Sequence, residues 1–331
     1  MRSFRLDFIR RMSPLVLALG IGFSGAGSAA TAAGSKASIS PQRPALVDRT
    51  PAEYARMDPR KLREALTTVA ISPDGRKIKQ PPTAQEVSAF LASLQERFTG
   101  GRNPARDRVS SETVIGPDTR TRIFATTAAP WRAIGRIENE ARCTGTLIGS
   151  RYVLTAGHCV YDLAREAFYP GFRFAPARNG SKTPYGVIGW KKAITTLGYM
   201  SQGLRDFDFA LIVLSQDVGN RTGWFRYGWK DPMPLYGIAI DGYPADKPPG
   251  TMWHAGCKLA PPTGRHTQRL YYPCDTSGGM SGSAIYARLA GGSPIVYGIH
   301  GYGVDGTGLN SGVRITRFVY DKLRTWQATY R

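Results

Sequence analysis

Residues 278–283 read Gly-Gly-Met-Ser-Gly-Ser and place Ser281 among glycines. Because glycine has no side chain, the carbonyl group of a substrate can approach the backbone closely at this position. A serine hydroxyl is a poor nucleophile until a base removes its proton. If Ser281 reacts with a substrate, the rest of the chain has to supply that base and a group that orients it.

Two other stretches contain residues with these properties. Residues 155–159 read Thr-Ala-Gly-His-Cys, which places His158 directly after an expected strand. Asp208 enters an apolar strand expected over residues 207–214, where an unpaired charge would be costly. A histidine can take the serine proton, and a buried aspartate fixes the tautomer of the imidazole. We therefore expect His158, Asp208 and Ser281 to form a catalytic triad.

The order of the three residues along the chain is His, Asp, Ser. Chymotrypsin-like enzymes have this order, whereas α/β-hydrolases have Ser, Asp, His and subtilisins have Asp, His, Ser. The order therefore favours the chymotrypsin-like class.

The residue pattern after position 113 also indicates an all-β fold. Short apolar or alternating runs are separated by glycine, and the chain contains 38 Gly and 23 Pro. The expected strands include residues 144–148, 152–155, 207–214 and 295–300. Helical periodicity returns only over residues 316–326, where Phe318, Val319, Leu323 and Trp326 share one face.

These motifs resemble those of the bacterial glutamyl endopeptidases and their V8-like relatives within the chymotrypsin clan. The matching segments are residues 113–122, 143–149, 155–162, 208–211, 275–283 and 298–301. The resemblance covers residues 113 to 331 and implies a secreted serine endopeptidase. It also implies a chymotrypsin-like double six-stranded β-barrel with a C-terminal helix.

The resemblance assigns the N-terminal barrel to residues 113–218 and the C-terminal barrel with the helix to residues 219–331, with the triad between them. It also implies that the backbone N–H groups of Gly279 and Ser281 form the oxyanion hole. Such donors point at negative charge that develops only in the transition state.

Four cysteines, at positions 143, 159, 257 and 274, suit two disulfides in an exported chain. The residues alone leave three connectivities open. The resemblance implies a Cys143–Cys159 bridge beside His158, which leaves Cys257 to pair with Cys274. No C-x-x-C or H-E-x-x-H motif occurs, so we expect no catalytic metal and no cofactor.

The resemblance also implies how the residue before the cleaved bond, P1, is recognised. In this family P1 is glutamate, and its carboxylate would be held in a pocket by His300 and Thr276. The new N-terminus at Thr113 would lie near this pocket. An imidazolium and a hydroxyl donor can satisfy a buried carboxylate. We therefore expect a preference for glutamate at P1.

Asp275 leaves an alternative open, because trypsin-type enzymes place the carboxylate that attracts Lys or Arg six residues before the nucleophile. In that reading Asp275, rather than His300, would recognise a basic P1 side chain. A second alternative is a non-catalytic binding module on the same fold.

The N-terminus resembles a signal peptide over residues 1–32. Four arginines precede an apolar run at 14–23, and small residues follow at 28–32. An uncleaved anchor is the alternative, although the run is shorter than the roughly 20 residues of a membrane span. We expect secretion into the periplasm or the medium, with no stable membrane association after cleavage.

Residues 33–112 are expected to be a partly helical pro-segment. Thr83 and Glu86 form a capping box, and a helical apolar face follows through Phe98. Glu112 precedes the expected mature start, which suggests self-cleavage; an outside protease cutting after Arg108 is the alternative.

The net charge of +20 is scattered along the chain rather than gathered into a stripe. Such a surface attracts acidic partners but does not indicate nucleic-acid binding. We expect protein or peptide substrates and the chain's own pro-segment as partners, and no nucleic acid.

Overall fold

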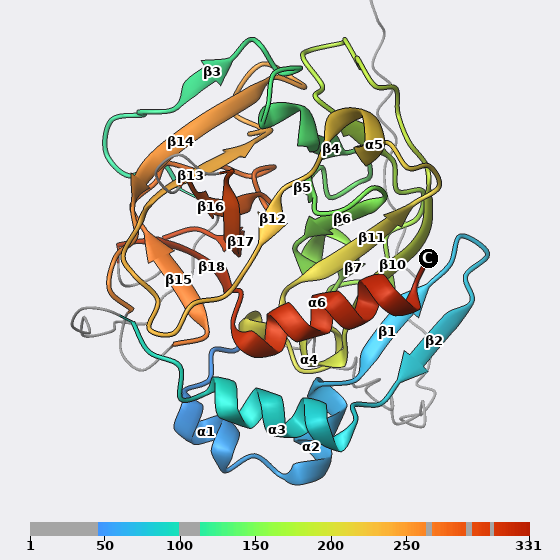
Figure 1. Ribbon diagram of the computed structural model, residues 1–331, viewed down its shortest axis with the longest axis vertical. Coiled ribbons are helices and arrows are strands. Elements are labelled where there is room, and N and C mark those ends of the chain that lie inside the picture. The colour runs from blue at the N-terminus through green and yellow to red at the C-terminus, as the bar shows by residue number, and fades with distance from the viewer. Residues whose placement is uncertain (1–45, 99–112, 263–266, 289–292, 305–307) are drawn as a thin grey trace, which may run out of the picture. The chain divides into compact units, whose positions relative to one another are not determined.

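The structure is a computed structural model that describes residues 46–98, 113–262, 267–288, 293–304 and 308–331 (Figure 1). The expected signal peptide at 1–32 and the expected processing sites at Arg108 and Glu112 lie outside these residues. No helix in the described ranges is long and apolar enough to cross a membrane.

The first sheet has eight strands in the order β2-β1-β10-β11-β6-β5-β4-β9. Six of them come from the first expected barrel: β4 (Ile134–Ile137), β5 (Thr144–Leu147), β6 (Tyr152–Thr155), β9 (Phe174–Pro176), β10 (Trp190–Thr196) and β11 (Ala210–Leu214). The other two, β1 (Thr68–Ile71) and β2 (Lys77–Gln80), come from the N-terminal segment. A small separate sheet joins β7 (Tyr161–Asp162) to β8 (Ala167–Phe168).

The second sheet has the order β15-β18-β17-β16-β13-β14-β3, and β12 pairs with β17 from outside this path. Six strands form the second barrel: β13 (Gly237–Gly242), β14 (Met252–Lys258), β15 (Arg269–Tyr272), β16 (Ala284–Ala287), β17 (Ile295–Tyr302) and β18 (Asn310–Arg314). The additional strands are β3 (Thr121–Ile123) and β12 (Arg226–Tyr227). The expected chymotrypsin-like double barrel is confirmed.

The C-terminal helix α6 (Arg317–Thr329) is also confirmed. Thr316 caps its N-terminus by accepting a hydrogen bond from the Val319 N–H. The four residues expected on its apolar face are all buried. Trp326 stacks on Phe209, with ring centroids 5.3 Å apart, and so fixes the helix to the first barrel.

Short helices occupy the connections between strands. They are α4 (Leu197–Met200), α5 (Gly219–Thr222), and the 3₁₀ turns η1 (Trp131–Ala133), η2 (Gly157–Cys159) and η3 (Arg205–Phe207).

The N-terminal segment has more structure than the sequence pattern indicated. The expected helix is present as α3 (Ala84–Ser93), and both hydrogen bonds of the Thr83/Glu86 capping box are formed. It ends before Phe98, which instead bridges to Met233, because Leu94 already closes the helix. Two more helices, α1 (Pro51–Ala55) and α2 (Pro59–Ala65), and the β1–β2 hairpin were not expected.

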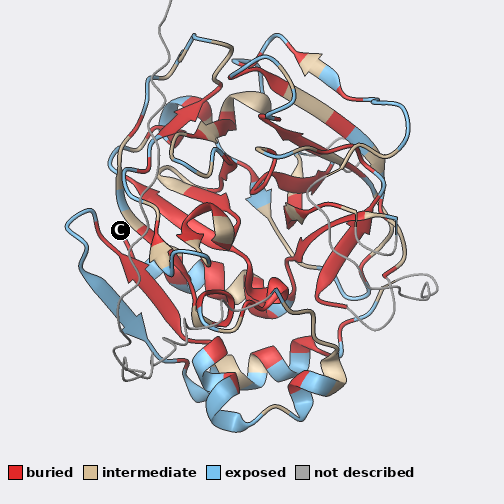
Figure 2. Ribbon diagram, turned by 180° about the vertical axis from the view of Figure 1, so that it is seen from behind, coloured by how far each residue is buried: buried red, intermediate tan, exposed pale blue. Residues whose placement is uncertain are grey.

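Most of these added elements are buried on one side, whereas β2 is exposed along its whole length (Figure 2). Strand β1 is buried throughout and pairs antiparallel with β10, from Thr68 opposite Thr196 to Ile71 opposite Ala193. The segment therefore extends the first sheet instead of lying loosely beside it.

Candidate active site

His158 lies in the turn η2, directly after β6. The Cys143–Cys159 disulfide is present, with an S–S distance of 2.05 Å, and ties this turn to the residue before β5. A methyl group at Gly157 would lie 2.8 Å from Asp208 Oδ1, so the turn can approach the carboxylate only with glycine there.

Asp208 follows η3 and is buried. Its Oδ2 is 2.7 Å from His158 Nδ1, and its Oδ1 accepts the His158 backbone N–H at 2.7 Å. Burial favours the neutral acid, but the attraction of His158 and hydrogen bonds from His158 and Tyr302 outweigh it and lower the pKa of Asp208. The expected pairing of an imidazole with a buried carboxylate is therefore present.

Tyr302 is a residue that the sequence analysis missed. Its hydroxyl donates to Asp208 Oδ2 at 2.5 Å from strand β17 of the second sheet. Burial, with Asp208 nearby, raises the pKa of Tyr302 well above its ordinary value, so the hydroxyl keeps its proton. The matched segment at 298–301 ends one residue earlier, and this adjacency was the only available signal.

Ser281 belongs to the turn before β16 and is 9% exposed. Its carbonyl oxygen accepts the Thr144 N–H at 2.9 Å, and the next N–H, from Gly282, donates to the His300 carbonyl at 2.8 Å. The turn is thus fixed to the first sheet on one side and to β17 on the other.

Two glycines of the second sheet region, Gly282 in the Ser281 turn and Gly301 in β17, indicate how closely these segments approach the His158 turn. A methyl group at Gly282 would lie 2.1 Å from Thr155 Oγ1 and 3.1 Å from Ala156 N, just before the histidine turn. A methyl group at Gly301 would lie 3.4 Å from Asp208 Oδ2 and 3.7 Å from His158 Cε1. The structure therefore brings the three expected triad segments together where the two sheets meet.

Gly279 has φ +95°, a conformation that favours glycine. A methyl group there would lie 2.5 Å from the Tyr243 carbonyl oxygen. The Gly279 carbonyl accepts the Thr144 hydroxyl at 2.8 Å, which fixes the peptide between Gly279 and Met280. In the described part of the chain, the Gly279 N–H has no acceptor.

His300 is completely buried in β17, with Nδ1 2.6 Å from the Tyr272 hydroxyl. Burial, and secondarily repulsion by His158, lower the pKa of His300 to about 3. The imidazole is therefore neutral near pH 7 when no anion is beside it.

Thr276 is buried as well, and its hydroxyl has no hydrogen-bond partner within the described ranges. Its N–H donates to the Thr113 carbonyl at 3.2 Å, which also accepts the Asn310 side-chain amide at 2.7 Å. Tyr272, the partner of His300, is opposite Asn310 in the strand register. Hydrogen bonds thus link Thr276, Thr113 and Asn310, and the strand of Asn310 pairs with the strand that carries Tyr272, the partner of His300.

Asp275 has partners of its own in the loop before β3. Oδ1 accepts the Ile115 N–H at 2.8 Å, and Oδ2 accepts the N–H and the hydroxyl of Thr119 at 2.8 and 2.6 Å. The second disulfide, Cys257–Cys274, holds the residue just before it. The Asp275 carboxylate is therefore committed to fixing this loop.

The sequence model of the trypsin family matches residues 120–320. The chain belongs to the trypsin family. It is a serine endopeptidase of the V8-like group in the chymotrypsin clan.

Individual relatives agree with this assignment. A glutamyl endopeptidase of Bacillus licheniformis is 38% identical over 235 residues, which cover 68% of this chain and 72% of that protein. A Bacillus subtilis protein named extracellular metalloprotease is 32% identical over 262 residues, covering 75% and 82%. A solved structure of a Glu endopeptidase in complex with MPD superposes with a TM-score of 0.60 at 29% identity, covering 65% of this chain and all of that one.

The one candidate metal-ligand group found in the described part of the chain does not suit a metal ion. Among the described residues, one group of three potential ligands is close enough together: Cys143, His158 and Cys159. Both sulfurs are joined in the disulfide, and metal binding requires thiolates. The Bacillus subtilis relative is named a metalloprotease, but these three residues of the present chain give no support for a metal site.

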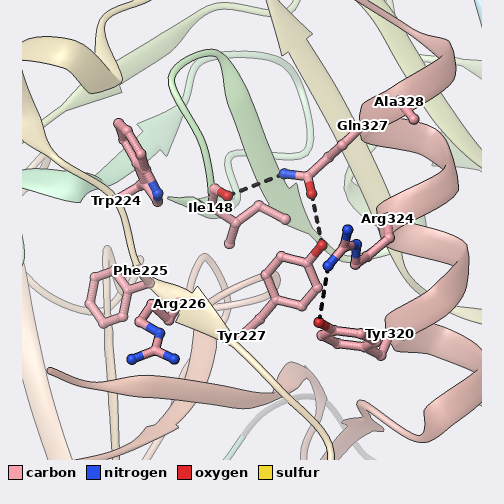
Figure 3. Close-up of a pocket in the computed structure, with 9 residues that line it drawn as sticks. All are labelled: Ile148, Trp224, Phe225, Arg226, Tyr227, Tyr320, Arg324, Gln327 and Ala328. Carbon is pink, nitrogen blue, oxygen red and sulfur yellow. Dashed lines mark hydrogen bonds between the residues drawn. The ribbon is translucent and has the colours of Figure 1, made fainter. Parts of the chain in front are cut away.

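A separate groove of about 480 Å³ lies between α6 and the chain around β12 (Figure 3). The Gln327 side chain lines this groove. It donates a hydrogen bond to the Ile148 carbonyl at 3.1 Å and accepts one from the Tyr227 hydroxyl at 2.7 Å. No residue of the expected triad or P1 pocket lines this groove.

Proposed function

We propose that this protease is secreted and cleaves peptide bonds after glutamate through an acyl-enzyme on Ser281. His158 Nδ1 faces Asp208, so Nε2 is the nitrogen that takes the serine proton. His158 then gives the proton to the leaving amine, and Asp208 stabilises the imidazolium formed in between. Water hydrolyses the acyl-enzyme by the same proton transfers in reverse.

The negative oxygen of the tetrahedral intermediate is bound by the N–H groups of Gly279 and Ser281. The constrained backbone of Gly279 supports this role, since the Gly279 carbonyl accepts the Thr144 hydroxyl while the Gly279 N–H remains available. Each donor of this kind contributes about 10²–10³-fold in rate.

The orientation of Asp275 is the observation that carries the acidic preference. Its two oxygens already accept three hydrogen bonds from residues 115–119, which draws the carboxylate away from a P1 side chain. His300 and the unpaired Thr276 hydroxyl then recognise P1. A bound carboxylate favours the imidazolium, so His300 takes up a proton when glutamate binds.

A trypsin-like preference for Arg or Lys through Asp275 is the weaker alternative, because that carboxylate would first have to break its loop contacts. A non-catalytic binding module is weaker still, since the imidazole–carboxylate pair and the glycine turn are both formed. Secretion is proposed from the signal-peptide pattern, and self-processing from Glu112 before Thr113.

The test is hydrolysis of matched peptides with Glu, Asp, Gln or Arg at P1 by the purified mature enzyme. Charge-assisted hydrogen bonds of about 1.5–3 kcal/mol predict that kcat/KM for Glu exceeds that for Gln by about 10–150-fold. His300→Gln should remove most of this ratio while leaving P1-Gln hydrolysis nearly unchanged. Fastest cleavage after Arg would overturn the acidic specificity without affecting the serine mechanism.

A further inference from the structure

The protease part of the chain buries four cations whose partners lie in the N-terminal segment, residues 46–98. They are Arg205, Arg269, Arg314 and Lys322. Asp48 pairs with Arg205 at 2.8 Å and with Arg269 at 2.6 Å. Glu96 pairs with Arg314 at 3.1 Å, and Glu86 with Lys322 at 2.6 Å. Removing the segment would take these carboxylates away, and any of the four cations that then stayed buried would be strongly destabilising.

Apolar and backbone contacts act in the same direction. Tyr54, Leu62, Val69 and Phe90 belong to the same buried core as the first barrel. The Trp326 indole N–H donates to the Thr68 hydroxyl at 3.0 Å, and β1 extends the barrel sheet beyond β10. The segment is therefore built into the fold of the protease.

Asp48 is also connected to the active site. The guanidinium groups of Arg205 and Arg269 lie over the ring of Tyr302, 4.9 and 4.8 Å from its centroid. The hydroxyl of that ring donates to Asp208 Oδ2 at 2.5 Å. Asp48 thus bridges the two cations that hold the ring against the carboxylate.

The N-terminal segment also contacts the chain at the start of η3. The Val47 N–H donates to the Gly203 carbonyl at 2.8 Å, and the Arg205 N–H donates to the Val47 carbonyl at 3.0 Å. The Tyr54 hydroxyl donates to Asp206 at 2.8 Å, two residues before Asp208. Asp206 also faces Arg269 and adds negative charge beside this ring. Tyr199 also faces Tyr302, but burial raises the pKa of Tyr199, so its hydroxyl keeps its proton and is neutral.

These contacts leave the catalytic histidine open to solvent. With the segment in place, the His158 side chain remains 26% exposed. Docking behind Asp208 therefore differs from the blocking of a substrate site that an inhibitory pro-segment requires.

Resting on the proposed triad, we propose that residues 46–98 are a lasting part of the active enzyme and that Asp48 is a positioning residue for Asp208, acting through Arg205, Arg269 and Tyr302. The segment stays bound by its buried contacts even when the chain is cut between it and Thr113. Its role is to support catalysis.

The first test compares Asp48→Asn with Asp48→Glu and with the matched control Glu86→Gln. The control also removes a segment carboxylate from a buried cation, but its partner Lys322 belongs to α6, whereas the cations over Tyr302 are Arg205 and Arg269. We expect Asp48→Asn to lower kcat by about 10–100-fold with little change in KM, because a small misplacement at a catalytic group is costly. Without the Asp48 carboxylate, the positive charge of Arg205 and Arg269 is uncompensated and disfavours protonation of His158. The acid limb of kcat/KM should therefore move to lower pH.

Asp48→Glu should restore much of kcat, and Glu86→Gln should lower the melting temperature while leaving kcat and the acid limb unchanged. Unchanged kcat and acid limb in a folded Asp48→Asn enzyme would overturn the positioning role. Wild-type enzyme that fails to cleave after Glu would instead reject the proposed specificity, so the two failures are distinguishable.

A second measurement applies even if Asp48→Asn does not fold. Processed wild-type enzyme is labelled with a fluorophosphonate, passed through gel filtration, and analysed by intact mass under denaturing conditions. We expect a fragment containing residues 46–98 to elute with the labelled chain in equimolar amount. Fully active labelled enzyme that lacks the fragment would overturn the proposal.

Discussion

Tyr302→Phe removes one oxygen atom and keeps the ring on which Arg205 and Arg269 lie. The lost hydroxyl donates at 2.5 Å to the buried, ionised carboxylate of Asp208. A hydrogen bond to a charged group contributes about 1.5–3 kcal/mol. We therefore expect the free energy of unfolding at pH 7 to fall by about that amount.

The pH dependence follows from the pKa of Asp208, which the Tyr302 hydrogen bond helps to lower. The stability that a depressed carboxylate provides is present above its unfolded pKa of about 3.9 and is lost as the pH falls through its folded pKa. Without the hydroxyl, the pKa of Asp208 in the folded protein rises, so as the pH falls the variant loses this stability earlier than the wild type does. The difference in the free energy of unfolding between variant and wild type is therefore largest near neutral pH and should narrow as the pH falls below about 4.

The assay is denaturant unfolding at a series of pH values, together with pH profiles of kcat/KM. Asp208 keeps both contacts to His158, so the rate should fall far less than the roughly 10⁴-fold that loss of the carboxylate costs a Ser-His-Asp triad. Tyr243→Phe is the control, because that buried hydroxyl donates to the neutral Arg178 carbonyl at 3.1 Å. Its cost should be about 0.5–1.5 kcal/mol and independent of pH. Equal, pH-independent losses in both variants would refute the reasoning.

Three further predictions concern specificity and processing. KM for P1-Glu peptides should rise with pH, because the pKa of His300 is about 3 in the free enzyme and increases when the carboxylate binds; KM for P1-Gln should stay flat. Asp275→Asn should lower the denaturation midpoint by loosening residues 115–119 but should not change P1 preference, and a shift of preference away from Arg would contradict this. Ser281→Ala should abolish cleavage after Glu112, as read by N-terminal sequencing, whereas unchanged processing would point to an outside protease.

Local motifs account for much of the candidate site. Gly157 and Gly282 are required because neighbouring atoms leave no room for a side chain, so the sequence around His158 and Ser281 carries its own geometric signature. The C-terminal helix was likewise predictable, because its apolar face and its cap at Thr316 are both local.

Contacts between distant residues were beyond the sequence pattern. Tyr302 reaches Asp208 across 94 positions, and Asp275 reaches Ile115 across 160. Arginine is usually a surface residue, so nothing local predicts the burial of Arg205 and Arg269. Their shared partner Asp48, distant in the sequence, is one of the contacts that permit it. The β1 strand was missed because a four-residue run such as Thr68–Ile71 becomes a strand only when β10 is beside it.

The most direct test of the catalytic account is covalent labelling of the mature enzyme with a fluorophosphonate, followed by peptide mapping. The account predicts one adduct per chain, on Ser281, with peptidase activity lost in proportion to labelling and no labelling of His158→Ala at the same exposure. Full peptidase activity after labelling, or an adduct on another residue that accounts for the inhibition, would contradict it.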